Sequence, residues 1–219
     1  MPRLLFEKTG NAVWISHLDL MRLFQRAFKR AGLPLTHTQG FNPRPSVSIA
    51  MPMSVGVESV CELLDFDLDG EPVACDEIMT RLNDTLVEGV RVLQVYENGK
   101  KIRDLSLLHC QVTLEYDSGI PENAISSLRT LFSRESLVVP KKSKNGIQEQ
   151  DIIPMLKHLE LMEAGEGELV LDSVVCCQNP TLNPMQLVMA IELHLPELKP
   201  DFAKCRRIEI FDTENNVFR

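Results

Sequence analysis

Apolar and polar residues recur in patterns that predict six elements in the first hundred residues. Residues 2–8 form a short apolar run typical of a strand, and residues 64–68 alternate apolar side chains with aspartates. Residues 17–31 repeat apolar side chains at helical spacing, between Ser16 as N-cap and Gly32 as C-cap. The remaining predicted elements are a strand at 47–50, a helix between 72 and 87, and a strand at 90–96. This β-α-β-β-α-β order is that of a ferredoxin-like half.

The second half of the chain repeats this order less regularly. The predicted strands cover 105–116, 137–140, 147–150, 169–176 and 206–211, and the predicted helices cover 121–132, 152–161 and 183–194. No long Ser- or Gly-rich linker divides the halves, so we expect them to pack together with a boundary near residue 100. The sequence therefore predicts an α+β protein of two tandem ferredoxin-like halves, residues 1–100 and 101–219.

Composition is that of an ordinary globular protein, with 44% hydrophobic and 25% charged residues. No apolar run approaches the ~20 residues needed to cross a bilayer, and Glu7 and Lys8 come too early for a signal peptide. A cytoplasmic protein without membrane contact is therefore expected. No pair of the six cysteines has C-x-x-C spacing, and no two of the five histidines have zinc-site spacing on a helix. The sequence accordingly predicts no metal site and no cofactor in this chain.

Charge is unevenly distributed along the chain. The formal net charge of −8 disfavours indiscriminate binding to nucleic acid. However, residues 1–50 hold seven Lys or Arg residues against two acids, whereas residues 51–100 hold three against eleven. A basic N-terminal segment followed by an acidic segment favours binding to a specific anionic partner.

The predicted helix at 17–31 carries much of this basic charge on one face. At about 100° per residue, Met21, Phe24, Phe28 and Ala31 share the apolar face. The opposite face carries four cations, Arg22, Arg26, Lys29 and Arg30. These cations form either a solvated surface over the core-facing stripe or a ridge that binds backbone phosphates.

Two histidines near this helix are candidate catalytic residues. His17 shares the inward face at the first turn, beside the N-cap Ser16 and Asp19, which supplies an acid to that turn. His17 is either a structural residue bonded to a nearby loop or a catalytic acid or base. His37 lies beyond the helix, and the sequence does not fix whether it reaches the same region.

The most unusual stretch is the loop Gln39-Gly40-Phe41-Asn42-Pro43-Arg44-Pro45. Its prolines hold the residues before them extended, and Gly40 permits a sharp turn. The loop either presents Phe41 to a base and Arg44 to a phosphate, or it is a rigid connector whose Phe41 fills the core. Downstream, Gly56 fits a turn, and Glu58 is a possible acid or base without a visible partner.

A second basic cluster is the predicted hairpin turn with Lys141, Lys142 and Lys144. This turn could complete a nucleic-acid-binding cleft with the first helix. The chain has no P-loop and no G-x-G-x-x-G, H-E-x-x-H or G-x-S-x-G motif, so none of the enzyme classes that these motifs mark is indicated.

Four motifs, S-H-L-D-L-M-R, A-G-L-P, Q-G-F-N-P-R-P and V-G-V-E-S, resemble those of a bacterial radical-SAM-associated domain family of unknown function. The motifs K-K-S-K-N-G and D-I-I-P extend the resemblance into the second half, whereas N-P-T-L-N-P departs from the family's Gly-x-Leu-x-Pro element. Domains of this family are fused to, or encoded beside, a B12-binding-type radical SAM protein. The resemblance implies an accessory module that has the radical SAM protein as its partner and that binds RNA or the ribosome. A weaker likeness is to the CRISPR repeat-processing endoribonucleases.

The sequence leaves three functions open. The first is a non-catalytic accessory module of a radical SAM protein, which binds RNA or a ribonucleoprotein through the basic surface. The second is a metal-independent endoribonuclease that uses His17 or His37. The third is a protein–protein docking module that does not bind RNA.

Overall fold

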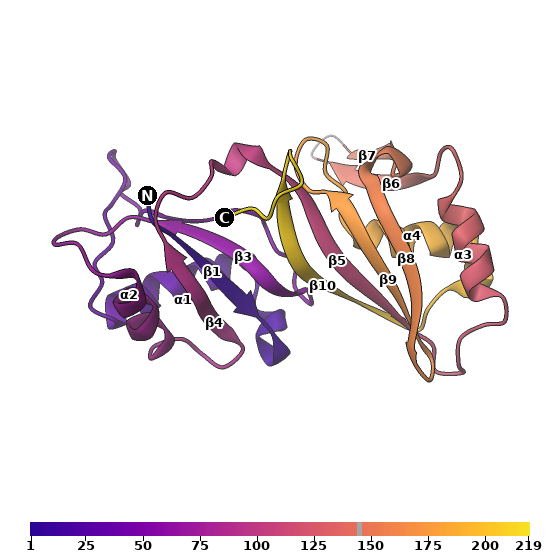
Figure 1. The fold of residues 1–219 in the computed structure, drawn as a ribbon, viewed down its shortest axis with the longest axis horizontal. Coiled ribbons are helices and arrows are strands. Elements are labelled where there is room, and N and C mark those ends of the chain that lie inside the picture. Colours follow the sequence, from indigo (N-terminus) through magenta and orange to yellow (C-terminus); the bar gives the residue numbers. More distant parts are fainter. Residues whose placement is uncertain (144–145) are drawn as a thin grey trace. The chain divides into compact units, whose positions relative to one another are not determined.

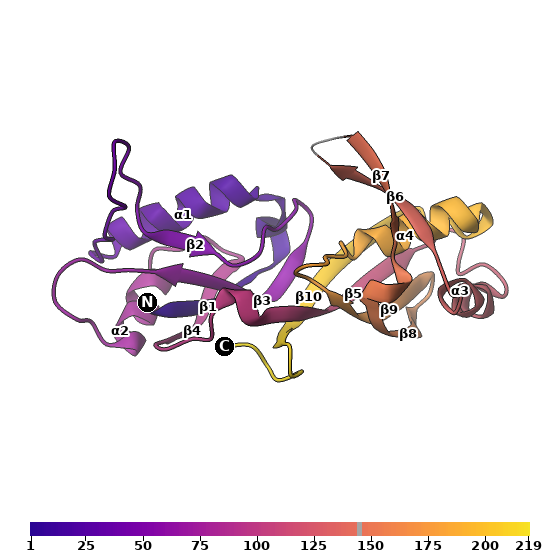
Figure 2. The same ribbon diagram turned by 90° about the horizontal axis from the view of Figure 1, so that it is seen from above.

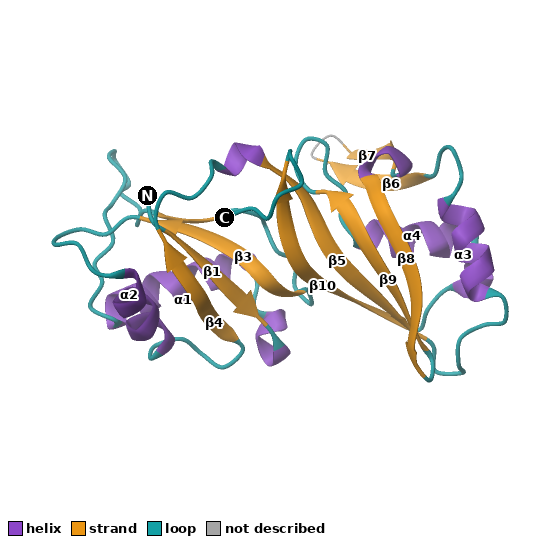
Figure 3. Cartoon of the chain, in the orientation of Figure 1, coloured by secondary structure: helices purple, strands orange, loops and turns teal. Residues whose placement is uncertain are grey.

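The computed structural model describes residues 1–143 and 146–219, which divide into two compact units (Figure 1). Unit 1 comprises Met1–Asp104 together with Arg219, and unit 2 comprises Leu105–Phe218. Helices and strands both occur in each unit (Figure 3), so the predicted α+β class is confirmed. Within the described residues, no helix is long and apolar enough to span a membrane.

Unit 1 has the predicted element order. The elements are β1 (Arg3–Lys8), α1 (His17–Arg30), β2 (Val47–Ile49), β3 (Glu58–Phe66), α2 (Cys75–Asn83) and β4 (Val90–Tyr96). The strands lie in the order β4-β1-β3-β2, and each strand is antiparallel to its neighbours. A short 3₁₀ helix (Gly10–Trp14) precedes α1.

The core of unit 1 lies between its sheet and its two helices. Alternate residues of a strand point to the same face, so Leu4 and Phe6 of β1 face the helices together. The rings of Phe6 and Phe24 meet edge to face with centroids 4.8 Å apart, an arrangement that adds to the effect of burial alone. Phe28 of α1 and Phe66 of β3 form a second contact, at 5.0 Å. These rings fix which face of α1 is turned inward.

Unit 2 contains an equivalent sheet and an additional hairpin. Its elements are β5 (Leu105–Glu115), α3 (Ala124–Phe132), β6 (Val138–Ser143), β7 (Gly146–Asp151), β8 (Leu156–Gly165), β9 (Glu168–Cys176), α4 (Met185–His194) and β10 (Phe202–Asp212). The strand order is β10-β5-β9-β8, again with antiparallel neighbours, and β6 and β7 pair separately with each other.

The predicted helix at 152–161 is wrong. The chain instead makes a short 3₁₀ turn (Ile153–Met155) and then enters strand β8. The spacing of Ile152, Leu156 and Leu159 fits a helix, but Pro154 has no backbone N–H to donate and lies inside the short 3₁₀ turn. The alternation of leucine with polar residues from His158 to Leu161 was the stronger signal.

Candidate nucleic-acid interface

A reciprocal cap fixes the start of α1. The Ser16 hydroxyl accepts from the backbone N of Asp19 at 3.2 Å and donates to Asp19 Oδ2 at 2.7 Å. This hydrogen bond, reinforced by Arg22, lowers the pKa of the Asp19 carboxyl below its ordinary value. The acid therefore stays ionised at the positive end of the helix.

The apolar face of α1 is turned into the core of unit 1. Its fully buried residues are Leu20, Phe24, Ala27 and Phe28. Met21 and Ala31, which the wheel placed in the centre of that face, are only half-buried at its margin. The opposite face is left to four exposed cations, Arg22, Arg26, Lys29 and Arg30.

Two of these four cations are already engaged. Arg22 Nη1 lies 2.9 Å from Asp19 Oδ1, and Arg30 Nη2 donates to the carbonyl oxygen of Thr85 at 2.7 Å. Arg26 and Lys29 form no side-chain hydrogen bond or ion pair within the described residues. They lie three residues apart on one face, so both charges are available to a phosphate backbone.

Residues 36–46, here called the finger, form a narrow hairpin after the C-terminal end of α1. Thr38 N donates to Arg44 O at 2.9 Å, and Ser46 N donates to Thr36 O at 2.8 Å. At its base, Thr36 is held by Asp67 through a backbone bond of 3.0 Å and a side-chain bond of 2.9 Å. The finger is therefore an ordered arm attached to the end of β3.

The tip of the finger, residues 39–43, extends away from the body of unit 1 (Figure 2). Phe41 is fully exposed, so the alternative in which it fills the core is wrong. Gly40 has a φ of +141°, which favours glycine, and Pro43 restricts Asn42 to extended conformations. Four other residues of this loop are also exposed, namely Gln39, Asn42, Pro43 and Arg44. Pro45, in the stem of the finger, is half-buried.

The structure does not bring His17 and His37 together. His37 lies on the finger and is exposed, whereas His17 begins α1 and its Nδ1 is buried without a hydrogen-bond partner. His17 is the first of the fourteen residues of α1, and at 1.5 Å per residue the helix places its other end, where the finger follows, about 20 Å away. The two imidazoles therefore cannot act as an acid–base pair on one bond.

The turn at Gly56 supports the segment before α1. Gly56 has a φ of +85°, its N donates to the carbonyl of Val13 at 2.9 Å, and the ring of Trp14 lies against it. Glu58 is half-buried at the start of β3.

The second predicted basic cluster belongs to unit 2. Lys141 of β6 donates from Nζ to the carbonyl of Thr181 at 3.4 Å. Lys142 lies in β6, and Lys144 lies outside the described residues.

A polar cluster on the sheet of unit 2 was missed from the sequence. His109 Nε2 lies 2.8 Å from Asp172 Oδ1, and Gln111 Nε2 donates to Asp172 Oδ2 at the same distance. The three side chains meet because β5 and β9 pair with Gln111 opposite Asp172. Only the strand register could have revealed this cluster, since the polar positions in each strand look like an ordinary exposed face. In the described ranges, no three His, Cys, Asp or Glu side chains are grouped to hold a metal ion.

One protein-family model matches most of the chain. A family model described as "Uncharacterized protein conserved in bacteria (DUF2344)" matches residues 2–184. The chain belongs to this family. A search of the curated proteins found no match to this DUF2344 member.

The fold is similar to a chain in a solved structure titled "Crystal Structure of a Cbf5-Nop10-Gar1 Complex", with a TM-score of 0.54 and 8% sequence identity. The match covers 95% of this chain and 48% of that chain, so this DUF2344 member spans about half the length of the protein it resembles. At this identity the likeness concerns the fold alone.

Proposed function

We propose that this protein is a non-catalytic module that binds single-stranded RNA, free or in a ribonucleoprotein, through the finger and the exposed cations of α1. The observation that carries the proposal is Phe41, a fully exposed aromatic ring at the tip of a hydrogen-bonded hairpin. A ring in that position contributes nothing to the core. Because the hairpin is already ordered, little conformational entropy of the loop is lost when a ligand stacks on the ring.

The free cations favour a nucleic acid over an apolar partner. Arg26 and Lys29 lie on α1, Arg44 lies in the finger that follows its C-terminal end, and all three are exposed. A strand that stacks a base on Phe41 would carry its phosphates within the field of these charges. The acidic remainder of the chain disfavours binding elsewhere, which limits contact to this region.

The proposal extends to the fold and the partner. Both units have the same strand order when β6 and β7 are set aside as an insertion, which supports two tandem ferredoxin-like halves. The motifs shared with the radical-SAM-associated family support an accessory role beside a B12-binding-type radical SAM protein.

The test is fluorescence anisotropy with a labelled single-stranded RNA of mixed sequence, at several salt concentrations. Phe41→Ala should weaken binding by about tenfold, because stacking on an aromatic ring contributes about 1–3 kcal/mol per base. The double variant Arg26→Ala/Lys29→Ala should reduce the slope of log affinity against log salt by about 1.4, or 0.7 for each lost phosphate contact.

Matched controls remove equivalent groups elsewhere. Phe202→Ala deletes another exposed ring, and Lys101→Ala/Arg103→Ala removes two other exposed cations. If the effect is local, both control variants should bind the RNA with an affinity within about twofold of that of the wild type. Salt-insensitive binding, or equal losses in test and control variants, would exclude the finger and α1 as the RNA site. Co-purification of a radical SAM protein without RNA binding would instead indicate a docking module.

A further inference from the structure

Strand β8 is the terminal strand of the sheet in unit 2. It pairs with β9 on one side, and within the described residues no strand pairs with its other side. In an antiparallel edge strand, alternate residues direct their N–H and C=O groups outward without partners. This edge is ten residues long, enough to accept another strand.

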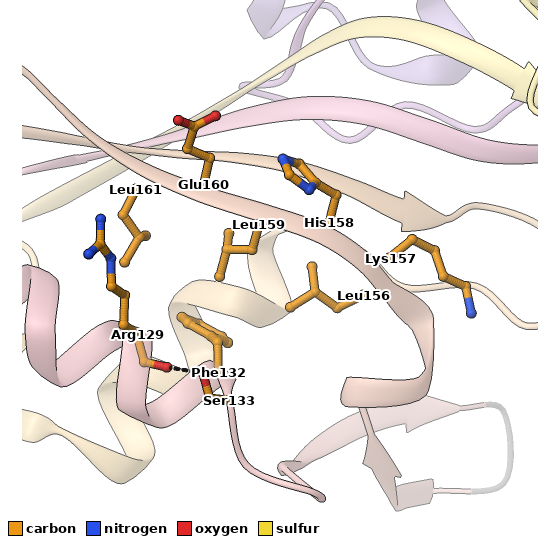
Figure 4. Close-up of a pocket in the computed structure, with 9 residues that line it drawn as sticks. All are labelled: Arg129, Phe132, Ser133, Leu156, Lys157, His158, Leu159, Glu160 and Leu161. Atoms are coloured by element: carbon orange, nitrogen blue, oxygen red, sulfur yellow. Dashed lines mark hydrogen bonds between the residues drawn. The ribbon is translucent and has the colours of Figure 1, made fainter.

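Residues of α3 and β8 line an open cavity of about 340 Å³ (Figure 4). Leu156, Leu159 and Leu161 point from β8 toward α3, where Phe132 faces them. His158 and Glu160 point to the opposite side of the strand. The cavity is therefore lined by these apolar side chains and also by polar ones, among them Arg129, Ser133 and Lys157, beside the unpaired edge of β8.

A second cavity, of about 960 Å³, continues the first toward the turn between β8 and β9. Arg129 lines both cavities, and the two together are here called the groove. The far end of the groove carries three carboxylates, Glu122, Glu163 and Glu166. None of the three forms an ion pair within the described residues, and all three are exposed.

We propose that this groove, residues 120–133 and 156–167, binds an extended segment of a partner protein as an additional strand against β8. Backbone hydrogen bonds to the open edge would provide affinity independent of sequence. Apolar side chains two positions apart in the ligand would contact Leu156, Leu159 and Phe132. A lysine or arginine of the ligand would lie among the three carboxylates at the far end.

Charge complementarity selects this occupant. The carboxylates repel nucleic acid, and they attract a basic side chain on a ligand whose backbone already fits the edge. A second copy of the chain is a weaker fit, because β8 pairing with itself about Glu160 would place two glutamates opposite each other. The groove lies wholly in unit 2, so this inference does not depend on the proposed RNA site.

The experiment selects ligands from a random linear peptide library displayed on phage, with the full chain immobilised. Enriched peptides should carry apolar residues at alternate positions, with a Lys or Arg beyond one end of that run. A recovered peptide is then synthesised, and its binding is measured by anisotropy against wild type and Glu163→Lys/Glu166→Lys. Reversing these two exposed charges should lower the affinity for the basic peptide by about tenfold. The same variant should select acidic peptides from the library.

The control Glu135→Lys/Glu149→Lys makes the same charge change at exposed positions outside the groove and should bind like the wild type. Hydrogen exchange should slow at the β8 amides in the presence of the peptide, and N-methylation of alternate peptide amides should abolish binding. Failure to enrich any sequence, equal binding by the charge-reversed variant, or protection outside β8 would overturn the proposal. A concentration-dependent dimer that protects β8 without peptide would overturn it in favour of a second copy.

Discussion

Thr38 and Arg44 close the finger through two hydrogen bonds in opposite directions. Thr38 N donates to Arg44 O at 2.9 Å, and Arg44 N donates to Thr38 Oγ1 at 3.0 Å. Pro43 and Pro45 have no N–H, so the amide of Arg44 is the only backbone donor between residues 43 and 45. The threonine hydroxyl satisfies it, and the stem of the finger is thereby held in one conformation.

Thr38→Val should therefore weaken RNA binding without removing any contacting group. Valine keeps the shape of threonine but not its hydroxyl, and a lost hydrogen bond of this kind is worth about 1 kcal/mol, or about fivefold in affinity. Anisotropy measures the loss. Thr130→Val in α3, which removes a hydroxyl bonded to Ser126 O at 2.9 Å, should leave affinity unchanged. If Phe41→Ala weakens binding but Thr38→Val does not, a closed stem is unnecessary for presenting the ring.

Asp19→Asn should strengthen RNA binding. The substitution releases Arg22, which Asp19 Oδ1 holds at 2.9 Å, and leaves the backbone bond from residue 19 to the Ser16 hydroxyl in place. We expect about a threefold gain at low salt that disappears at high salt, because both charges are exposed and screened. Glu97→Gln removes the same charge from another exposed position of unit 1. An equal gain in both variants would mean that net charge alone acts, with no contribution from Arg22.

The fold was predictable where turn signals bound an apolar run on both sides. The strand predicted at 90–96 is β4 with the same limits, because Val90, Val92 and Val95 lie between Gly89 and the Asn98-Gly99 turn. The helix predicted at 152–161 failed because Ile152, Leu156 and Leu159 follow helical spacing, whereas Leu159 and Leu161 alternate with polar residues as in a strand. Pro154 and the pairing with β9 favour the strand. Short apolar runs of this kind are resolved by tertiary pairing, which one sequence does not display.

The candidate site was predictable as a surface but not in its details. The helical wheel placed Arg22, Arg26, Lys29 and Arg30 on an exposed face, where they lie. It could not show that Arg30 is bound to the carbonyl of Thr85, which is fifty-five residues away in the chain. The exposure of Phe41 was likewise open, since a proline-rich loop can direct an aromatic side chain inward or outward.

Gly89→Ala should destabilise unit 1 strongly. Gly89 has a φ of +83°, and an added Cβ would meet the carbonyl oxygen of Thr9 and lie 2.9 Å from the Cβ of Ala12. Thr9 N also donates to Gly89 O at 2.7 Å, so the backbone cannot move away without losing that bond. We expect a loss of about 2–4 kcal/mol in the free energy of unfolding, measured by urea denaturation. Gly165→Ala, where an added Cβ has no neighbour within 4 Å, should change stability little.

Asp151 should make the β6–β7 hairpin sensitive to acid. Its Oδ1 accepts from Leu137 N at 2.9 Å and from Ile153 N at 3.1 Å, and so it joins both ends of the hairpin. The bond from Leu137 is the main cause that lowers the pKa of this carboxyl from its ordinary 3.8. Because the pKa is lower in the folded state, the carboxylate stabilises the fold above pH 3.8, and this stabilisation is lost as pH falls through the folded pKa.

Asp151→Asn should therefore cost about 1 kcal/mol at pH 7, since a neutral acceptor bonds the two amides more weakly than a carboxylate does. The difference from wild type should narrow as pH falls below 3.8, where the aspartate is protonated and also becomes neutral. Chemical denaturation at pH 7, 5 and 3 measures this difference directly. The control is Glu149→Gln on β7, whose exposed side chain forms no hydrogen bond or ion pair in the described residues, and it should differ little from the wild type. A constant gap for Asp151→Asn at all three pH values would mean that the charge of Asp151 does not contribute to holding the hairpin.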